Sequence, residues 1–289
     1  MIAVLKLIKK NQRARTESCL EFMNKDVQIL IPTYKRLKAL AVTLTSLYYQ
    51  QENFDVLISD QSDNDEIESD NSIRTIIRLL QNKGRDVEIK RNLPRRGMAQ
   101  QRQFLLDNAT AKYSLFLDDD LVLEPYVVRN LKHTLQKENC GFVGSAVIGL
   151  SYQYDVRLHQ QHIEFWEDGI KPENVIPSGK AWQRYRLHNA ANIYHVAERY
   201  NATPENPVAY KVAWIGGCVM YDTAKLCDVG GFDFWKDLPD NHCGEDVLAQ
   251  LRVMKRYGGC GIIPSGVYHQ ELETTVPDRT INAPEHLEI

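Results

Sequence analysis

Short apolar runs alternate with amphipathic stretches through the first half of the chain. Four runs have the length and composition of buried strands, at residues 27–31, 55–59, 87–90 and 113–117. Between them, apolar residues recur at helical spacing over residues 37–50, 67–80 and 98–111. Strands and helices that alternate in this way predict a mainly parallel central sheet with helices on both faces, and so an α/β, Rossmann-like fold.

The pattern loosens after about residue 150. Residues 151–206 are rich in Tyr, His, Asn, Pro and Gln and show little periodicity. Regular spacing returns with an apolar run at residues 208–215, a pair of glycines and a predicted helix over residues 245–257. No repeat or low-complexity stretch interrupts the chain, so we expect a single domain.

Unusual polar residues follow three of the predicted strands. Pro32, Thr33 and Tyr34 follow the first strand, Asp60 follows the second, and the acidic triplet at 118–120 follows the fourth. Each of these alone is explained by a polar loop. In parallel sheets, however, ligands bind beyond the carboxyl ends of the strands. Because all three segments open at that edge, the sequence predicts a ligand site there.

The triplet Asp118, Asp119 and Asp120 is the strongest chemical signal. Adjacent carboxylates repel one another, and a divalent cation removes that cost. Asp118 and Asp120 are two positions apart, so on an extended segment they point to the same side. Their hard oxygen atoms suit Mg²⁺ or Mn²⁺ that bridges phosphate oxygens. The alternative is a solvated acidic turn.

A basic segment leads into the predicted helix that begins near residue 98. Residues 90–97 include Arg95 and Arg96, and the helix itself carries Arg102. Arginines beside a helix N-terminus favour anions, which predicts a diphosphate site near the acidic triplet. A solvated basic loop explains Arg95 and Arg96 equally well, but it does not explain Arg102.

Two further candidates lie late in the chain. Glu245 and Asp246 occupy the first turn of the helix at 245–257, where acids often only compensate the helix macrodipole. A carboxylate there is also a plausible general base for an acceptor hydroxyl. His269 follows a strand-like run, and a lone histidine is more often structural than a ligand.

Composition narrows the class of protein. The chain has 289 residues, a formal net charge of −3 and 43% hydrophobic residues, which is typical of a globular protein and argues against a nucleic-acid partner. Its six cysteines include no C-x-x-C pair, so we expect thiols in a reducing cytosol rather than a zinc ribbon or disulfides. The fingerprints of dehydrogenases, P-loop NTPases, zincins and α/β-hydrolases are missing.

The N-terminus leaves two interpretations open. No apolar run approaches the roughly 18 residues of a membrane span. The first ten residues are apolar and then basic, which is the reverse of a signal peptide. Residues 1–15 are either a packed or frayed extension or a short helix in peripheral contact with an anionic membrane. We therefore expect a cytoplasmic protein, at the inner face of a membrane in the second case.

Taken in order, the motifs resemble those of family-2 glycosyltransferases. The set comprises residues 29–34, Asp60, residues 97–102, residues 116–120, Gly216-Gly217, residues 230–233, residues 244–246 and His269. The resemblance covers residues 27–270 and implies the GT-A fold. We divide the chain into an N-terminal extension (1–26), a nucleotide-sugar-binding half (27–123), an acceptor-binding and catalytic half (124–270) and a C-terminal tail (271–289).

The resemblance implies an inverting, metal-assisted transferase of the kind used in polysaccharide biosynthesis. It would move a sugar from a nucleotide-sugar, most simply a UDP-sugar, to a hydroxyl of a glycan, lipid-linked or protein acceptor. Asp246 matches the family's general base. Asp118, Asp120 and His269 would hold Mn²⁺ or Mg²⁺ in a DXD-type site.

The remaining roles carry over by position. The donor would be bound by Pro32, Thr33 and Tyr34 at the nucleotide, Asp60 at the base or ribose, Arg102 at the base or diphosphate, and Asp118 or Asp119 at the ribose. The acceptor would contact Trp214, Gly216, Gly217 and Glu245. One departure concerns Gln61, because the family often has a second acid there, and this leaves the nucleotide base open.

Two other functions are compatible with this layout. A sugar-nucleotide nucleotidyltransferase would normally show a Gly-rich loop after the first strand, where this chain has Pro32, Thr33 and Tyr34. An inactive nucleotide-sugar-binding protein would not need Asp120 and Asp246. Large aromatic residues in the second half form either a platform for a sugar ring or part of the core: Trp182, Tyr185, Trp214 and Trp235.

Overall fold

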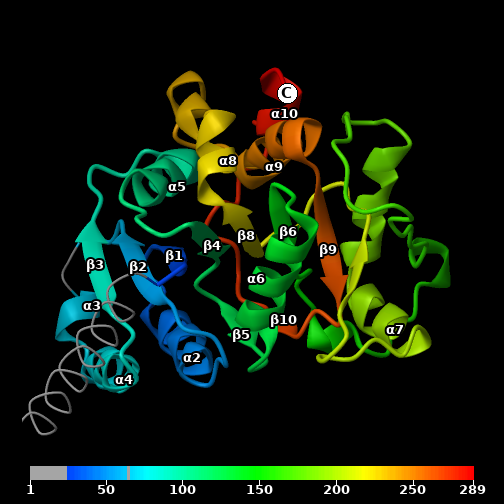
Figure 1. Cartoon of the computed structure of the whole chain (residues 1–289). Coiled ribbons are helices and arrows are strands. Elements are labelled where there is room, and N and C mark those ends of the chain that lie inside the picture. The colour runs from blue at the N-terminus through cyan, green and yellow to red at the C-terminus, as the bar shows by residue number, and fades with distance from the viewer. Residues whose placement is uncertain (1–24, 64–65) are drawn as a thin grey trace, which may run out of the picture.

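The computed structural model describes residues 25–63 and 66–289, and it contains one large twisted sheet (Figure 1). Its eight strands lie in the order β3-β2-β1-β4-β8-β6-β9-β7. Their bounds are β1 (Val27–Thr33), β2 (Asp55–Asp60), β3 (Val87–Arg91), β4 (Tyr113–Leu117), β6 (Phe142–Gly144), β7 (Val208–Tyr210), β8 (Cys218–Asp222) and β9 (Gly259–Ile263). A second, two-stranded sheet pairs β5 (Leu121–Leu123) with β10 (Val267–His269).

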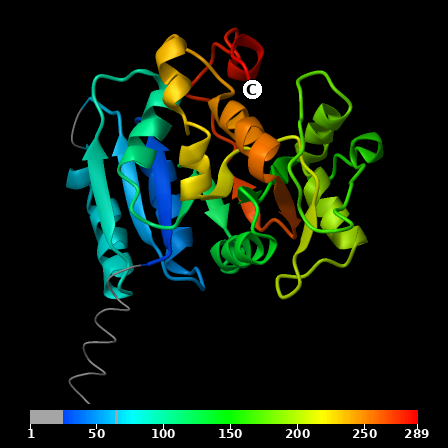
Figure 2. The same cartoon turned by 45° about the horizontal axis from the view of Figure 1, so that its top comes forward.

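Helices cover both faces of the sheet, as the sequence predicts. Because side chains alternate along a strand, Leu30 of β1 packs on one face, and its neighbours Ile29 and Ile31 pack on the other. The first face is covered by α5 (Gly97–Asp107) and α9 (Glu245–Tyr257), seen in front of the sheet in Figure 2. The second face is covered by α2 (Leu37–Tyr48), α4 (Asn71–Asn82) and α6 (Val127–Glu138).

The remaining helices are short. They are α3 (Glu66–Ser69), α7 (Asn192–Arg199), α8 (Thr223–Asp228), α10 (Ala283–His286) and four 3₁₀ segments, η1 (Leu150–Tyr152), η2 (Leu158–Gln160), η3 (Ala181–His188) and η4 (Asp233–Asp237). The predicted helix over residues 67–80 is wrong in one respect, because it is divided into α3 and α4. Asp70 caps α4 by accepting a hydrogen bond of 2.9 Å from the Ile73 N–H, and this forces an extended residue between the two helices.

The mainly parallel sheet is confirmed, with an antiparallel insertion. β3, β2, β1 and β4 form a parallel block, and β6 also pairs with β9 in parallel. β8 runs antiparallel between β4 and β6. The apolar run at 208–215 is a strand only as far as Tyr210, and the segment beyond it turns away from the sheet.

The small sheet joins two segments that are far apart in sequence. In the β5–β10 pair, His269 lies opposite Leu121, the residue that follows the acidic triplet. The backbone N–H of Gln270 also donates to the carbonyl of Asp120 at 2.9 Å. This pairing brings the late histidine to the end of β4.

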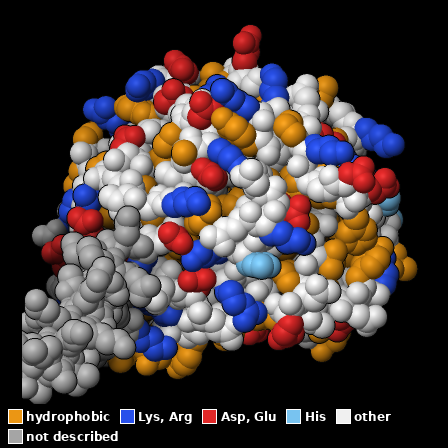
Figure 3. Space-filling model, viewed as in Figure 1, with side chains coloured by type: hydrophobic (Ala, Val, Ile, Leu, Met, Phe, Trp, Pro, Cys, Tyr) orange, Lys and Arg blue, Asp and Glu red, His pale blue; other side chains and the backbone are white. Residues whose placement is uncertain are grey.

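The surface mixes charges of both signs, and hydrophobic side chains gather over one flank near α7 (Figure 3). Across the described ranges, no helix combines the length and the apolar character that crossing a bilayer would require. Residues 1–15, for which we considered membrane contact, lie outside the described residues, as does Cys19. Five cysteines are described, and all have free thiols: Cys140, Cys218, Cys227, Cys243 and Cys260.

Candidate active site

A cavity of about 770 Å³ opens at the carboxyl edge of the parallel strands. Its walls include most of the residues to which the resemblance assigns a role: Pro32, Thr33, Tyr34, Arg102, Asp118, Asp119, Asp120, Trp214, Gly216, Gly217, Glu245, Asp246 and His269. Among the residues with an assigned role, Asp60 is the exception. Its side chain is buried, and it accepts a 2.8 Å hydrogen bond from the backbone N–H of Ser62 rather than lining the cavity.

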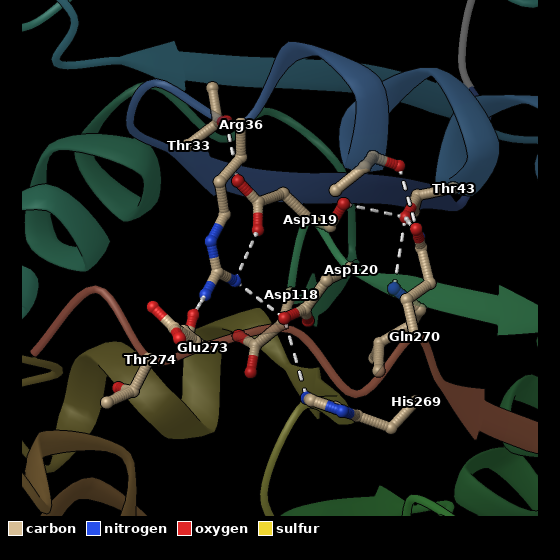
Figure 4. A network of polar contacts seen from close by, with 12 residues as sticks. Thr33, Arg36, Thr43, Asp118, Asp119, Asp120, His269, Gln270, Glu273 and Thr274 are labelled. Atoms are coloured by element: carbon tan, nitrogen blue, oxygen red, sulfur yellow. Dashed lines mark hydrogen bonds and ion pairs between the residues drawn. The ribbon is translucent and has the colours of Figure 1, made fainter. Parts of the chain in front are cut away.

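The acidic turn is held in place by hydroxyl and amide side chains (Figure 4). Thr33 donates to the Asp119 carboxylate at 2.6 Å, and Thr43 donates to the Asp119 carbonyl at 2.8 Å. Burial raises the pKa of Asp119 to about 6, although the Thr33 hydrogen bond and nearby Arg36 oppose the rise. The Asp119 side chain and backbone are therefore fixed by the hydroxyls of β1 and α2.

Arg36 lies over the acidic turn and joins it to the C-terminal segment (Figure 4). Its Nη1 is 2.6 Å from Oδ2 of Asp120 and 3.4 Å from Oδ1 of Asp119. Its Nη2 donates to the backbone carbonyl of Glu273. A guanidinium thus stands beside the carboxylate that we predicted to be the main metal ligand.

His269 approaches the same carboxylate. Its Nε2 lies 3.4 Å from Oδ2 of Asp120. Its Nδ1 accepts a hydrogen bond of 2.7 Å from the backbone N–H of Glu271. In a neutral imidazole only one nitrogen carries a proton, so this contact places the proton on Nε2, facing Asp120. Coordination of a metal through Nε2 would require that proton to move.

The donor set suits Mg²⁺ or Mn²⁺ only if a phosphate completes it. Among residues 25–63 and 66–289, no group of three or more His, Cys, Asp or Glu side chains is arranged to hold a metal ion. Asp120 and His269 converge, whereas the Asp118 carboxylate faces Arg102. These cations are commonly held by one or two carboxylates together with substrate phosphates and water. Asp120 fits such a site, and His269 fits it after the change of tautomer.

Arg102 links the acidic turn to α9. Its Nη2 donates to Asp118 at 3.0 Å and its Nε donates to Glu245 at 3.0 Å. Burial alone would lower the pKa of Arg102, but Asp118 and Glu245 outweigh it and raise the pKa above its ordinary value. A permanently charged group with two carboxylate partners fixes the distance between the two acidic elements.

Asp246 is the titratable group best placed for proton transfer. It sits in the first turn of α9 and lines the cavity. Burial, and then the neighbouring Glu245, raise the pKa of Asp246 to about 7, against the opposing charge of Arg102. A carboxylate that titrates near neutral pH is suited to general-base chemistry.

The side of the cavity next to β1 and α5 carries an aromatic face. Tyr34 follows β1, and the Arg95 guanidinium stacks on its ring at 4.1 Å. Both side chains line the cavity. The N-terminus of α5, which we expected to be free for a diphosphate, is partly occupied, because the Ala99 N–H donates to His242 at 3.1 Å.

Trp182 and Trp214 also line the cavity, whereas Tyr185 contacts both rings and is outside the lining. Trp235 packs against the core and is also outside the lining. Sequence analysis missed Arg36 and His242 as site residues because neither belongs to a recognisable motif. It also described residues 271–289 as a tail, although this segment forms one rim of the cavity through Leu272, Thr274, Thr275, Val276, Arg279, Asn282 and Glu285.

Comparison with known proteins shows a family and a fold. The model of glycosyl transferase family 2 matches residues 28–199. Mannosyltransferase PcManGT from Pyrobaculum calidifontis, in complex with GDP-Man and Mn²⁺, aligns with a TM-score of 0.54 at 15% identity over 88% of this chain. S. aureus TarS 1-349, in complex with UDP-GlcNAc, aligns with a TM-score of 0.51 at 14% identity over 87% of this chain.

These structural alignments bear on the fold. They confirm the expected GT-A arrangement of sheet and helices. The chain covers 59% of the PcManGT chain and 60% of the TarS chain, so it spans well under two thirds of either. No curated protein sequence matches it.

Proposed function

This chain belongs to glycosyl transferase family 2, and from that premise we propose that it transfers a sugar from a nucleotide-sugar to an acceptor hydroxyl. The observation that carries the proposal is the cavity, whose walls hold both the acidic turn and Asp246. Arg102 joins the turn to the start of α9 through Asp118 and Glu245. The acidic turn suits a cation with a diphosphate, and Asp246 suits a hydroxyl that must lose a proton.

The donor is proposed to lie on the side of β1 and α5. Tyr34 and Arg95 offer a stacked face for a nucleobase, and Thr33 lies beside the acidic turn. The complexes of TarS with UDP-GlcNAc and of PcManGT with GDP-Man support a nucleotide-sugar as donor. We propose a UDP-sugar, with Asp118 or Asp119 toward the ribose. Asp60 would act behind the nucleotide wall, through the Ser62 backbone that it holds.

Asp120 and His269 are proposed to hold Mn²⁺ or Mg²⁺ together with the donor diphosphate. When bound, the cation would offset negative charge on the departing diphosphate. The Mn²⁺ in the PcManGT complex supports this assignment. The Arg36 guanidinium already places a positive charge beside the Asp120 carboxylate.

The chain's own residues then account for transfer with inversion. Asp246 accepts the proton of the acceptor hydroxyl, and the oxygen attacks the anomeric carbon from the side opposite the leaving group. Glu245 does not compete as a base, because its carboxylate is engaged by Arg102. Gly216 leaves room beside Asp246 for the acceptor, and Gly217 lies next to it beside Asp118.

Hydrolysis of the donor tests the proposal without knowledge of the acceptor. We expect the purified chain to release nucleoside diphosphate from one member of a panel of UDP-, GDP- and dTDP-sugars, and to do so faster with Mn²⁺ than with EDTA. Asp120→Asn is the matched variant, because it keeps the shape of the side chain and removes its charge. No diphosphate release from any donor, or equal release by wild type and Asp120→Asn, would contradict the proposal.

A further inference from the structure

Two tryptophans form an aromatic wall on the acceptor side of the cavity. The rings of Trp182 and Trp214 both line it, with centroids 6.5 Å apart and planes inclined at 50°. Tyr185 stacks on Trp214 at 6.4 Å with an interplanar angle of 5°. Both tryptophans are only partly buried, so part of each ring is accessible from the cavity.

Gly216 places this wall beside Asp246. A methyl group built on Gly216 would lie 3.8 Å from Oδ2 of Asp246 and 3.8 Å from Cζ3 of Trp214. The indole edge and the carboxylate therefore border the same small space, which is open because residue 216 has no side chain. A six-membered ring seated against Trp214 would bring a hydroxyl group within reach of Asp246.

Hydrogen bonds fix the position of Trp214 relative to Asp246. Gln250 lies one helical turn after Asp246 on α9 and is fully buried. Its side chain accepts from the Ile215 N–H at 2.8 Å and donates to the Ile215 carbonyl at 2.7 Å. The backbone next to Trp214 is thus bound to the helix that carries Asp246.

The other tryptophan is also held from behind. Trp182 and Tyr185 are three residues apart in the 3₁₀ segment η3, where such residues eclipse and share a face. On another side of η3, Arg184 forms ion pairs with Glu164 at 2.8 Å and Glu173 at 2.7 Å. Its side chain is largely buried, so these pairs anchor η3 and leave the aromatic face turned to the cavity.

This wall has the chemistry of a sugar-binding surface. Flat aromatic faces pack against the C–H face of a saccharide ring while its hydroxyls remain free for hydrogen bonds, and binding sites join apolar walls with a few polar groups in this way. Arg102, whose charge acts on Asp246, is already paired with Asp118 and Glu245. The wall therefore offers an apolar face with acids beside it, which favours a sugar ring over a phosphate group.

We propose that Trp182, Trp214 and Gly216 form a subsite for a saccharide acceptor, so that this enzyme extends a glycan. The inference rests on the proposed transferase function. In the step itself, the acceptor O–H bond breaks and its proton passes to Asp246. The acceptor oxygen forms a bond to the anomeric carbon, and the bond from that carbon to the donor phosphate breaks, its electron pair leaving with the nucleoside diphosphate.

Oligosaccharide binding tests the subsite separately from catalysis. The probes are a glycan microarray and, for titration, maltotetraose, cellotetraose and chitotetraose. We expect wild type to bind at least one glycan, Trp182→Ala and Trp214→Ala to bind it at least about tenfold more weakly, and Trp235→Phe to bind it normally. Trp235→Phe is the matched control because Trp235 lies outside the cavity.

Gly216→Ala is a second variant, which tests the subsite even if the tryptophan variants fail to fold. Its new methyl group meets only ordinary contacts at 3.8 Å, so the fold should tolerate it while the ring space is filled. We expect Gly216→Ala to lose glycan binding while its circular dichroism spectrum and its midpoint of urea unfolding match those of wild type. Failure of wild type to bind any glycan, or unchanged binding by the folded Trp214→Ala and Gly216→Ala variants, would overturn the subsite. Donor hydrolysis in the same preparations reports on the transferase function independently.

Discussion

The imidazole of His242 accepts a hydrogen bond of 3.1 Å from the backbone N–H of Ala99, in the first turn of α5. The other ring nitrogen, Nδ1, lies 2.7 Å from the Pro239 carbonyl, which can only accept. The ring is therefore neutral, with its proton on Nδ1. A side chain from the loop before α9 thus caps the helix that carries Arg102, and it joins these two parts of the cavity wall.

The two hydrogen bonds of His242 can be separated by substitution. In His242→Gln, the side-chain amide extends as far as Nε2 of the histidine and can still accept from the Ala99 N–H. In His242→Asn, the amide extends only as far as Nδ1 and loses this hydrogen bond. Since loss of a helix cap costs about 1 kcal/mol, we expect His242→Asn to lower the free energy of unfolding by about that amount and to raise KM for the donor. His242→Gln should stay close to wild type. Urea unfolding and donor hydrolysis measure both effects, and equal behaviour of the two variants would rule out the cap.

Neither His242 nor Gln250 could be identified from sequence. The helix at 245–257 was predicted with its observed bounds because local signals mark it: Gly244 precedes it, acids open it and Gly258 ends it. The acidic turn likewise follows a clear apolar strand. His242 and Gln250 have no such pattern, because their partners are backbone groups that only the folded chain brings near.

The same reason explains what the sequence did not predict in the second half. β8 gains its place between β4 and β6 from long-range antiparallel pairing, which leaves no periodic signature in so short a strand. The C-terminal tail at 271–289 forms a rim of the cavity because the β5–β10 pairing returns the chain to it.

Asp246→Asn should separate transfer from donor binding. The amide keeps the shape of the side chain but cannot accept the proton, so transfer to a verified acceptor should fall by roughly 10²–10⁴, the usual contribution of a general base. Calorimetry should show nearly unchanged affinity for the nucleotide. Glu285→Gln, at the cavity rim, is a matched control that should transfer normally. Substantial transfer by Asp246→Asn would remove Asp246 from this role.

The stability gained by Asp246→Asn should depend on pH. Burial raises the pKa of Asp246 from 3.8 to about 7, so the fold favours the protonated acid. The protonated Asp246 side chain therefore adds to the free energy of unfolding of wild type. This addition is fully present below about pH 4 and is lost as the pH rises through about 7, whereas Asn does not titrate. Urea unfolding should therefore show that the free energy of unfolding of the variant, relative to that of wild type, is higher at pH 8 than at pH 4.5. An equal difference at the two pH values would contradict the raised pKa.

Arg36 should compete with a divalent cation in the absence of nucleotide. Its guanidinium is 2.6 Å from Oδ2 of Asp120 and would repel a second positive charge. We expect Arg36→Gln to bind Mn²⁺ more tightly than wild type when no nucleotide is present, as measured by the free Mn²⁺ signal in electron paramagnetic resonance. Arg95→Gln is the control, because Arg95 stacks on Tyr34, and its Mn²⁺ affinity should match wild type. Weaker Mn²⁺ binding by Arg36→Gln would mean that Arg36 helps to shape the site.

His269 is the metal assignment with the most distinctive test. Its Nε2 faces Oδ2 of Asp120 at 3.4 Å, but the Glu271 N–H bonded to Nδ1 places the proton on Nε2. Ligation therefore requires the ring proton to move to Nδ1 and the Glu271 N–H to turn away, and this should accompany donor binding. Imidazole suits Mn²⁺ better than Mg²⁺, so His269→Ala should weaken nucleotide binding more with Mn²⁺ than with Mg²⁺, whereas Asp120→Ala should abolish the contribution of both cations.

Pulsed electron paramagnetic resonance of the Mn²⁺–UDP complex decides whether the imidazole is bound directly. A nitrogen ligand couples to the Mn²⁺ electron spin, so we expect a ¹⁴N modulation in wild type that is lost in His269→Ala and kept in His242→Gln. If wild type shows no such coupling, His269 is not a ligand. Its contact with Asp120 would then only orient the carboxylate, as histidines in the outer shell of metal sites do. In that case His269→Ala should weaken nucleotide binding equally with Mn²⁺ and with Mg²⁺.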